Sequence, residues 1–508
     1  MAEPDAFKES MAVKFTTPMI PWSRILRLWI CVVSVLALPG LNAALWPEAG
    51  QAWHYQILGP STYLDDCPPC GRPSVLRPLR GSFRMLRGID DPLWRRFLLR
   101  DIDWTVGDGE TGIRLRGEGT LEVGGEVALV HRLRISLIHS IPGRPDEVVG
   151  FVSDPVPGEG PWPRVDADLK EVDPTPFRVL SLHVASLPIR ELWFSTAHGF
   201  AAGLPDPAPV RRGAVEVLAQ SGSVVLSGPT IAASLGLSSL EGLDLDALEV
   251  GAGGEPMVSF TKDVGSAPLG GIASGDLVGI PARRVRNYTG FSGVLGAQPP
   301  VADLGLDAVQ RRPDGTWWFS IRQPVFSETL GELLGRGDVL STTGKRIRSN
   351  ADLLRAFGPK ESAKDYGLDA LFVWPSGEIW FSTEDSFVLK DGSIIGDGDL
   401  LSDRGEVVWR NRELLGRFSP LEDLADFGLD ALVVVTDAVV STGEPPRVAV
   451  RWTPSGLRLD WSGTGRFFQT EVASGLPDVF EPRGPIRWEH QVELPVDRPA
   501  GLFRIREW

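Results

Sequence analysis

The chain has 508 residues, of which 43% are hydrophobic and 23% charged, and its formal net charge is -15. A chain of this length is long enough for roughly two to four domains. Because it is acidic and contains no basic block, phosphate backbones and anionic lipid surfaces repel it, so we expect neither nucleic acid nor a membrane surface as a partner.

Residues 1–43 have the pattern of an export signal. Arg24 and Arg27 precede an apolar run at residues 28–38, and a small residue at Ala43 offers a cleavage site. The alternative is a membrane anchor, but a helix that crosses the bilayer core needs about 20 apolar residues. We therefore predict a signal peptide and a mature protein that is secreted or held at the cell surface, with no membrane insertion after cleavage.

Residues 44–178 have the pattern of antiparallel strands. Apolar and polar residues alternate over residues 113–123, and Gly124-Gly125 then marks a hairpin turn. His131 and His139 share the apolar face of the returning strand; we interpret them as packed residues, with metal ligation as the less favoured reading. The region is predicted to be a β-sandwich of two sheets.

Cys67 and Cys70 form a Cys-Pro-Pro-Cys segment between acidic residues and a Gly-Arg-Pro turn. In an exported protein we predict a small disulfide between them. A thioredoxin-like redox site and half of a zinc site are the alternatives, but the flanking residues are typical of a loop rather than of a helix start.

The most regular feature lies in residues 179–440, where a Leu-Asp-Ala phrase recurs every 61 or 62 residues. Its copies begin at Leu245, Leu306, Leu368 and Leu429, and the first three are followed by an apolar pair that ends in Ser259, Ser320 or Ser382. A fixed period of this length indicates one structural unit repeated along the chain.

Each repeat contains four short strand candidates, and the strand that carries the repeated serine is apolar on both faces. A strand of this kind must be covered on both sides. These features favour a β-propeller-like array of four blades, or five if residues 429–435 begin another, with an open solenoid as the alternative. The first repeat departs from the pattern, because Leu182 stands where the others carry an aspartate.

Residues 441–508 lack the Leu-Asp-Ala phrase. Apolar and polar residues alternate there in successive short segments, which predicts a small fibronectin-III-like sandwich. With the export signal, the Leu-Asp-Ala-Leu...Gly...Phe-Ser repeats make the chain resemble uncharacterised secreted bacterial repeat proteins. The resemblance implies an all-β architecture over most of residues 180–508 and no activity.

Two columns of aspartates recur in the repeats. Asp246, Asp307, Asp369 and Asp430 precede the first strand of a repeat, and Asp276, Asp338 and Asp399 follow a glycine further on. The favoured interpretation is structural: such an aspartate accepts hydrogen bonds from its own turn, and with the repeated serine ties one strand unit to the next. The alternative is calcium, with Asp391, Asp397 and Asp399 as the best candidate ligands.

Aromatic residues among polar neighbours suggest a second kind of site. The sequence has 17 tryptophans, and we predict that Trp317 and Trp409 are exposed and, with Asp338 and Asp399, contact a ligand. Trp193, Trp318 and Trp380 are predicted to be core residues.

No familiar catalytic motif occurs in the sequence, which favours a non-catalytic binding protein without a cofactor. We expect the propeller loops to bind an extracellular glycan or protein. The alternatives are a secreted carbohydrate-active enzyme, which needs only two suitably spaced carboxylates, and a structural spacer of the cell surface or matrix.

Overall fold

We analysed a computed structural model of the chain. It describes residues 46–47, 51–71, 73–107, 112–125, 129–157, 163–203, 210–298, 303–422, 426–438, 446–454, 456–473, 480–494 and 502–508. Residues 1–43, where we expect the signal peptide, lie outside this set. The protein is all-β, as the sequence predicted, with 51% strand and 7% helix.

The N-terminal strands form one antiparallel sheet that closes on itself. They are β1 (Ala52–Ile57), β2 (Thr62–Asp66), β3 (Val75–Arg87), β4 (Trp94–Val106), β5 (Arg114–Gly124), β6 (Val130–Ser140), β7 (Glu147–Ser153), β8 (Val156–Pro157), β9 (Val165–Glu171) and β10 (Val179–Leu187). Strands β3 to β7 pair in chain order and β7 pairs with β9. Both β1 and β2 lie between β3 and β10, and β10 pairs with β9 to close the circuit.

This closed sheet differs from the predicted sandwich of two sheets. Alternating side chains on the long strands point to one shared interior, where Tyr55, Phe83 and Trp104 are fully buried. Alternation is the same for a sandwich and for a closed sheet, so the sequence pattern could not separate them. His139 lies inside with its Nε2 3.2 Å from the Tyr63 hydroxyl, and His131 packs edge-on against Trp46, which fits packed residues.

The disulfide between Cys67 and Cys70 lies in the turn between β2 and β3. Their Cα atoms are 5.3 Å apart, and the intervening residues form a short 3-10 helix, η1 (Pro68–Cys70). Gly71 follows in the left-handed conformation, which glycine adopts without strain. The CxxC segment is therefore a loop, as its flanking residues indicated.

The repeat region contains four four-stranded antiparallel sheets. From the inside outward, the first is β35 (Ala431–Thr436), β11 (Ile189–Ser195), β14 (Val217–Ala219) and β15 (Val224–Leu226). The second is β16 (Leu245–Val250), β17 (Pro256–Phe260), β20 (Leu277–Gly279) and β21 (Arg283–Arg286). The third is β23 (Val309–Arg311), β24 (Trp317–Phe319), β27 (Val339–Ser341) and β28 (Lys345–Arg348). The fourth is β29 (Leu371–Val373), β30 (Ile379–Phe381), β33 (Leu400–Ser402) and β34 (Glu406–Trp409).

Small hairpins and short helices decorate these sheets. The additional strands are β12 (Phe200–Ala202), β13 (Val210–Arg212), β18 (Val264–Ser266), β19 (Gly270–Ile272), β22 (Ala297–Gln298), β25 (Val325–Ser327), β26 (Glu332–Leu334), β31 (Phe387–Val388) and β32 (Ile394–Ile395). The helices are α1 (Gly228–Leu235), α2 (Tyr288–Ser292), η2 (Gly293–Leu295), α3 (Asn350–Leu353) and α4 (Asn411–Leu414), with one α-helix after the outermost strand of each sheet.

The fourth copy of the Leu-Asp-Ala phrase completes the first sheet instead of starting a fifth. Its strand, β35, pairs antiparallel with β11 from Ile189 opposite Thr436 to Ser195 opposite Ala431. The innermost strands contact one another in the cycle β35, β16, β23, β29 and back to β35. The four sheets therefore form a closed ring, in which the last repeat strand joins the first sheet.

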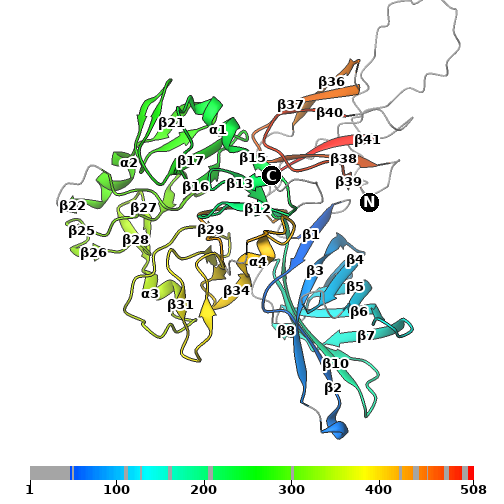
Figure 1. Cartoon of the computed structure of the whole chain (residues 1–508). Helices are drawn as coiled ribbons and strands as arrows, with labels where there is room; N and C mark the ends of the chain where they lie inside the picture. The colour runs from blue at the N-terminus through cyan, green and yellow to red at the C-terminus, as the bar shows by residue number, and fades with distance from the viewer. Residues whose placement is uncertain are drawn as a thin grey trace, which may run out of the picture.

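The C-terminal residues form two three-stranded sheets. One contains β36 (Arg447–Thr453), β37 (Gly456–Ser462) and β40 (Gln491–Leu494); the other contains β39 (Glu481–Pro482), β38 (Phe468–Ala473) and β41 (Leu502–Glu507). Trp461 and Leu494 of the first sheet share a core with Phe468 and Ile505 of the second. In Figure 1 these orange and red strands lie at the upper right, above the blue-to-cyan N-terminal sheet and to the right of the green repeat sheets.

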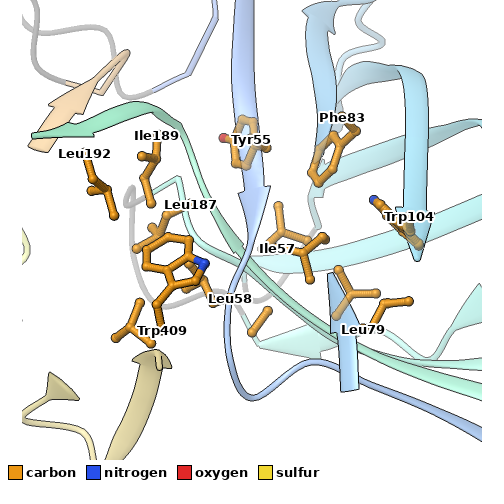
Figure 2. Packing of buried hydrophobic residues seen from close by; sticks show 14 of the residues in the cluster. Tyr55, Ile57, Leu58, Leu79, Phe83, Trp104, Leu187, Ile189, Leu192 and Trp409 are labelled. Atoms are coloured by element: carbon orange, nitrogen blue, oxygen red, sulfur yellow. The ribbon is translucent and has the colours of Figure 1, made fainter. Parts of the chain in front are cut away.

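An apolar junction joins the N-terminal sheet to the ring. Trp409, at the end of β34, is buried close to Leu58, Leu187 and Ile189 (Figure 2). Only Pro188 separates β10 from β11, so one nearly continuous strand passes from the N-terminal sheet into the first sheet of the ring. The two parts therefore share both a strand and a hydrophobic core.

A buried ion network joins all three parts of the chain. The carboxylate of Asp437, directly after β35, accepts hydrogen bonds from the His54 backbone N–H at 2.8 Å and from Arg190 Nε at 2.9 Å. It also accepts them from Arg506 Nη2 and Trp508 Nε1, both at 2.8 Å. Burial alone would raise the pKa of Asp437, but Arg190 and Arg506 outweigh it and the pKa is lowered.

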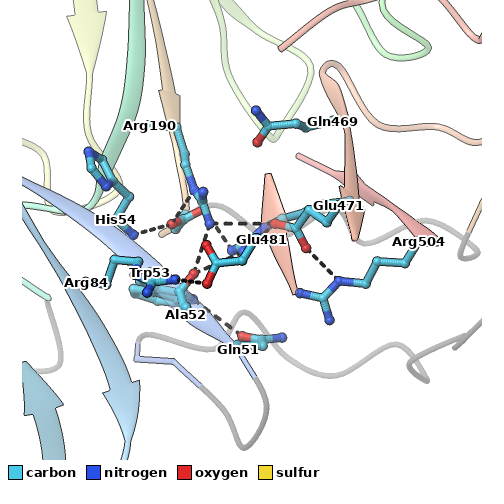
Figure 3. Close-up of polar contacts among 12 residues, drawn as sticks. Gln51, Ala52, Trp53, His54, Arg84, Arg190, Gln469, Glu471, Glu481 and Arg504 are labelled. Atoms are coloured by element: carbon cyan, nitrogen blue, oxygen red, sulfur yellow. Dashed lines mark hydrogen bonds and ion pairs between the residues drawn. The ribbon is translucent and has the colours of Figure 1, made fainter. Parts of the chain in front are cut away.

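Glu471 extends this network on the C-terminal side. Arg504 donates to its carboxylate at 2.6 Å, and the carboxylate lies 3.9 Å from Arg190 (Figure 3). The same carboxylate lies 3.5 Å from Arg506. The two buried arginines are thus held between two buried carboxylates.

We expect Asp437→Asn to lower the free energy of unfolding by about 3 kcal/mol, because it removes one of the two carboxylates that compensate the mostly buried Arg190 and Arg506 and leaves only Glu471 to pair with them. Urea unfolding followed by tryptophan fluorescence measures the change. The matched control is Asp154→Asn, which removes an exposed ion pair with Lys170 and should cost about 1 kcal/mol or less. Equal, small effects of the two substitutions would contradict the role of the network.

Candidate functional site

Four aspartates, one from each Leu-Asp-Ala phrase, meet at the centre of the ring. Each stands at or just before the start of an innermost strand, so the closed ring brings the four to one end of its axis. We call them the central acidic ring: Asp246, Asp307, Asp369 and Asp430. Asp246, Asp307 and Asp430 are buried, and Asp369 is partly exposed.

A second set of residues points to the same centre. These residues lie two positions after the repeated serine, and we call them the inward positions: Ala197, Thr261, Arg322 and Glu384. Each inward residue, or the residue directly after it, donates its backbone N–H to a carbonyl that lies two or three positions before a ring aspartate. Arg322 forms ion pairs with Asp246 and Asp307, the latter at 3.3 Å from its Nε. Glu384 pairs with Arg336.

Burial and mutual repulsion raise the pKa values of the central carboxyls. Burial is the largest cause in every case, and the pKa reaches about 6 for Asp307, about 7 for Glu384 and about 8 for Asp430. The pKa values of Asp246 and Asp369 also lie well above the usual range, each raised further by a neighbouring ring carboxylate. Arg322 acts in the opposite direction on Asp246, Asp307 and Asp430.

The electrostatic balance at the centre therefore favours a proton or another positive group. Five carboxyls converge there, and Arg322 and Arg336 are the arginines that pair with them. Buried like charges stay ionised only when a cation compensates them. The centre can bind protons, or it can bind a cationic group that replaces them.

The second acidic column has a structural role that accounts for its spacing. Asp338 accepts hydrogen bonds from the backbone N–H groups of Gly335 at 3.0 Å and Asn350 at 3.1 Å. Asp399 does the same with Gly396 and Asn411, both at 3.0 Å. Asp276, the third member, accepts from Ala273 and Tyr288. Each aspartate thus joins its turn to the start of the following helix, so Asp338 and Asp399 are not free to contact a ligand as we had predicted.

The repeated serines tie each sheet to the next, as we interpreted them. Ser259, Ser320 and Ser382 donate to the carbonyls of Leu306, Leu368 and Leu429, at 2.8, 3.1 and 2.6 Å. Each acceptor directly precedes a ring aspartate. The serine bonds therefore fix the position of the carboxylates on three sides of the centre.

The calcium candidate does not assemble. Asp391 accepts from the backbone and hydroxyl of Ser393 in its own turn, Asp397 accepts from Ser386, and Asp399 pairs with Arg410. Within the described parts of the chain, no group of three or more His, Cys, Asp or Glu side chains is arranged to hold a metal ion.

The prediction that Trp317 and Trp409 are exposed is wrong. Trp317 is 8% exposed and packs against Phe291, while its neighbour Trp318, which we had placed in the core, is partly exposed beneath the Arg312 guanidinium. The polar residues before Trp317 belong to a tight turn and do not show which face the strand buries. Trp409 is covered by the N-terminal sheet, a contact that local sequence cannot reveal.

Sequence reasoning missed Arg322, Glu384 and Arg336. For Arg322 and Glu384 the available signal was the inward position itself, which changes its chemistry from copy to copy while the residues around it repeat. A position that varies inside a regular repeat is a candidate for function rather than for structure.

Comparisons with known proteins identify no family. No protein-family model matches the chain, and no curated protein matches it. Among solved structures, it is similar to the extracellular domain of a protein described as a hybrid two-component system from B. thetaiotaomicron. The identity is 7% and the TM-score 0.19, with 84% of this chain and 78% of that chain covered. A similarity of this size carries no argument about this chain. Among the described residues, no helix is both long and apolar enough to cross a membrane.

The raised pKa of Asp430 predicts a pH-dependent stability. The folded state holds this proton up to about pH 8, whereas an unfolded aspartate releases it near its ordinary pKa of 3.8. Stability from this group is therefore fully present below the unfolded pKa of 3.8, falls as the pH rises above that value, and is lost once the pH passes about 8. Asp430→Asn mimics the protonated form, so its melting temperature should exceed that of the wild type at pH 8.5 and exceed it by less at pH 5.5.

The groups that face Asp430 include Asp244, Asp307, Asp369 and Asp397 as well as Arg322, so the comparison must isolate one carboxyl. The control is Asp391→Asn, because the pKa of this exposed aspartate is lowered by Ser393. Its melting temperature should differ from that of the wild type by the same amount at both pH values. A pH-independent difference for Asp430→Asn would contradict the prediction.

Proposed function

We propose that this chain is a secreted or cell-surface binding protein without catalytic activity, in which the repeat region forms a four-bladed β-propeller. The support for a propeller is the closed cycle of innermost strands and the completion of the first sheet by β35. The N-terminal closed sheet and the fibronectin-III-like C-terminal part flank the ring and hold it through the Asp437 network.

We propose that the binding site is the central acidic ring and that its partner is a polypeptide with an exposed arginine or lysine side chain. The observation that carries this proposal is the convergence of the four ring aspartates and Glu384 on a centre with fewer cations than carboxyls. An acidic site attracts positively charged ligands and speeds their association.

A glycan partner has less support. The glycan hypothesis rested on exposed faces of Trp317 and Trp409, and both side chains are buried. The carbohydrate-active alternative needs two carboxylates that are free to act on a substrate, whereas those of Asp338 and Asp399 accept hydrogen bonds from their own turns and helix starts.

The test is retention of the purified protein on beads that carry poly-L-arginine, with poly-L-glutamate and an insoluble neutral polysaccharide for comparison. We expect retention on poly-L-arginine that weakens with salt, because screening acts on exposed charge pairs. The variant Asp369→Asn/Asp430→Asn should bind at least roughly tenfold more weakly, a loss of about 1.4 kcal/mol.

The matched control is Asp314→Asn/Asp391→Asn, which also replaces two carboxyls by amides but at two exposed turn residues. Its retention should equal that of the wild type. Equal loss in both variants would mean that only the overall charge matters, and would overturn the assignment of the site. Selective retention on the neutral polysaccharide would instead favour a carbohydrate ligand.

A further inference from the structure

Three of the inward positions can be compared with one another, because each packs against a glycine that precedes a Leu-Asp-Ala phrase. Gly305, Gly367 and Gly428 precede the Leu-Asp-Ala phrases, and all three have positive φ angles, of 74°, 72° and 74°. A Cβ on these glycines would lie 2.7 Å from Arg322 Cβ, 2.4 Å from Glu384 Cδ and 2.5 Å from Ala197 Cβ, respectively.

The backbone gives the same correspondence. The residue after the inward position donates its N–H to the carbonyl of Leu304 in the third sheet, of Tyr366 in the fourth and of Phe427 in the first, at 3.1, 3.0 and 3.0 Å. Arg322, Glu384 and Ala197 therefore occupy equivalent places around the centre.

Two of the inward residues, Arg322 and Glu384, lie between the aspartate of their own sheet and that of the preceding sheet. Arg322 contacts Asp307 of its own sheet and Asp246 of the preceding one. Glu384 is held against the glycine that precedes the phrase of its own Asp369, and the preceding Asp307 is the charged group that most raises its pKa. By the same relation, Ala197 lies between Asp430 of its own sheet and Asp369 of the preceding one.

Ala197 supplies neither charge nor bulk at its place. Asp430 is a buried residue, 6% exposed, and within the described parts of the chain no side chain forms an ion pair or hydrogen bond with its carboxylate. Asp369 is likewise surrounded by negative charge, because the charged groups that act most strongly on its pKa are all carboxylates. Ala197 and Asp369 are both partly exposed, so this place is reachable from solvent.

We propose that the place between Asp369 and Asp430, beside Ala197, is a binding site for the guanidinium group of an arginine side chain from a polypeptide partner. The built-in Arg322 shows the chemistry, because it fills the equivalent place between Asp246 and Asp307. A planar guanidinium donates to two carboxylates at once and remains charged at any physiological pH. This inference rests on the proposed function and names the group that the site accepts.

The test is isothermal titration calorimetry of the intact protein with Nα-acetyl-L-arginine amide at pH 8.5 and low salt. The matched ligand is Nα-acetyl-L-citrulline amide, which has nearly the same shape and no charge. We expect the arginine derivative to bind at least tenfold more tightly than the citrulline derivative. Its affinity should fall between pH 8.5 and pH 6.0, because protons then compete for the carboxyls. Equal affinities for the two ligands, or no binding of either, would overturn the proposal.

Variants at Ala197 distinguish this place from the rest of the centre. Ala197→Arg should abolish binding of the arginine derivative and raise the melting temperature at pH 8.5, because it supplies the missing cation. Ala197→Gln fills the same space without charge and should weaken binding without that rise. If Ala197→Arg does not fold, Asp430→Asn gives the decisive comparison with Asp391→Asn, which should bind as the wild type does. If Ala197→Arg folds and binds the arginine derivative as the wild type does, or if Asp430→Asn does so, the assignment is overturned.

The two proposals fail in different ways. If the protein is retained on poly-L-arginine beads through Asp369 and Asp430 but the monomeric arginine derivative does not bind, this inference is overturned and the proposed function stands. If the protein is not retained on poly-L-arginine beads, the proposed function itself is overturned.

Discussion

The pairing of β35 with β11 is the contact on which the rest of the architecture depends. It joins residues 431–436 to residues 189–195, far apart in the sequence, and turns a row of four sheets into a ring. The entropy of closing such a long loop grows only slowly with its length, so a fully buried six-residue strand can offset it. The same pairing places Asp430 at the centre of the ring and Asp437 at the junction of the three parts. The site and the domain arrangement are therefore consequences of one strand pairing.

Short strands impose a second constraint, which explains why so many polar side chains are buried in the repeats. Most strands of the third and fourth sheets have three or four residues and form few ladder hydrogen bonds, so the turns between them contain many backbone groups that need other partners. The repeated aspartates, serines and asparagines supply them. Asn411, for example, accepts from Phe427 and donates to the carbonyls of Gly398 and Gly428. The periodic polar residues are thus a condition for the fold.

Periodicity made most of the repeat region predictable, and contacts between distant parts made the remainder unpredictable. The repeated phrase predicted four equivalent units, the two-sided apolar strand and the structural serine bonds, because each depends on residues within one repeat or the next. Closure of the N-terminal sheet depends on β9 and β10 meeting, and burial of Trp409 depends on a separate domain, so neither left a local signal. The central acidic ring was visible as a column of aspartates, but only the closed ring shows that these four converge while Asp338 and Asp399 do not.

The central carboxyls, when ionised and without enough compensating cations, lower the stability of the folded state. Repetition of one phrase around an axis places like charges together, and the two arginines that pair with the central carboxyls, Arg322 and Arg336, relieve only part of the repulsion. A sequence selected for stability alone would place a neutral residue at one of these positions, as it places Ala197 and Thr261 at two inward positions. A cationic ligand that binds only the closed ring stabilises that ring by mass action. In the proposed function, charge that destabilises the ring on its own therefore contributes to the free energy of binding when a partner supplies a cation.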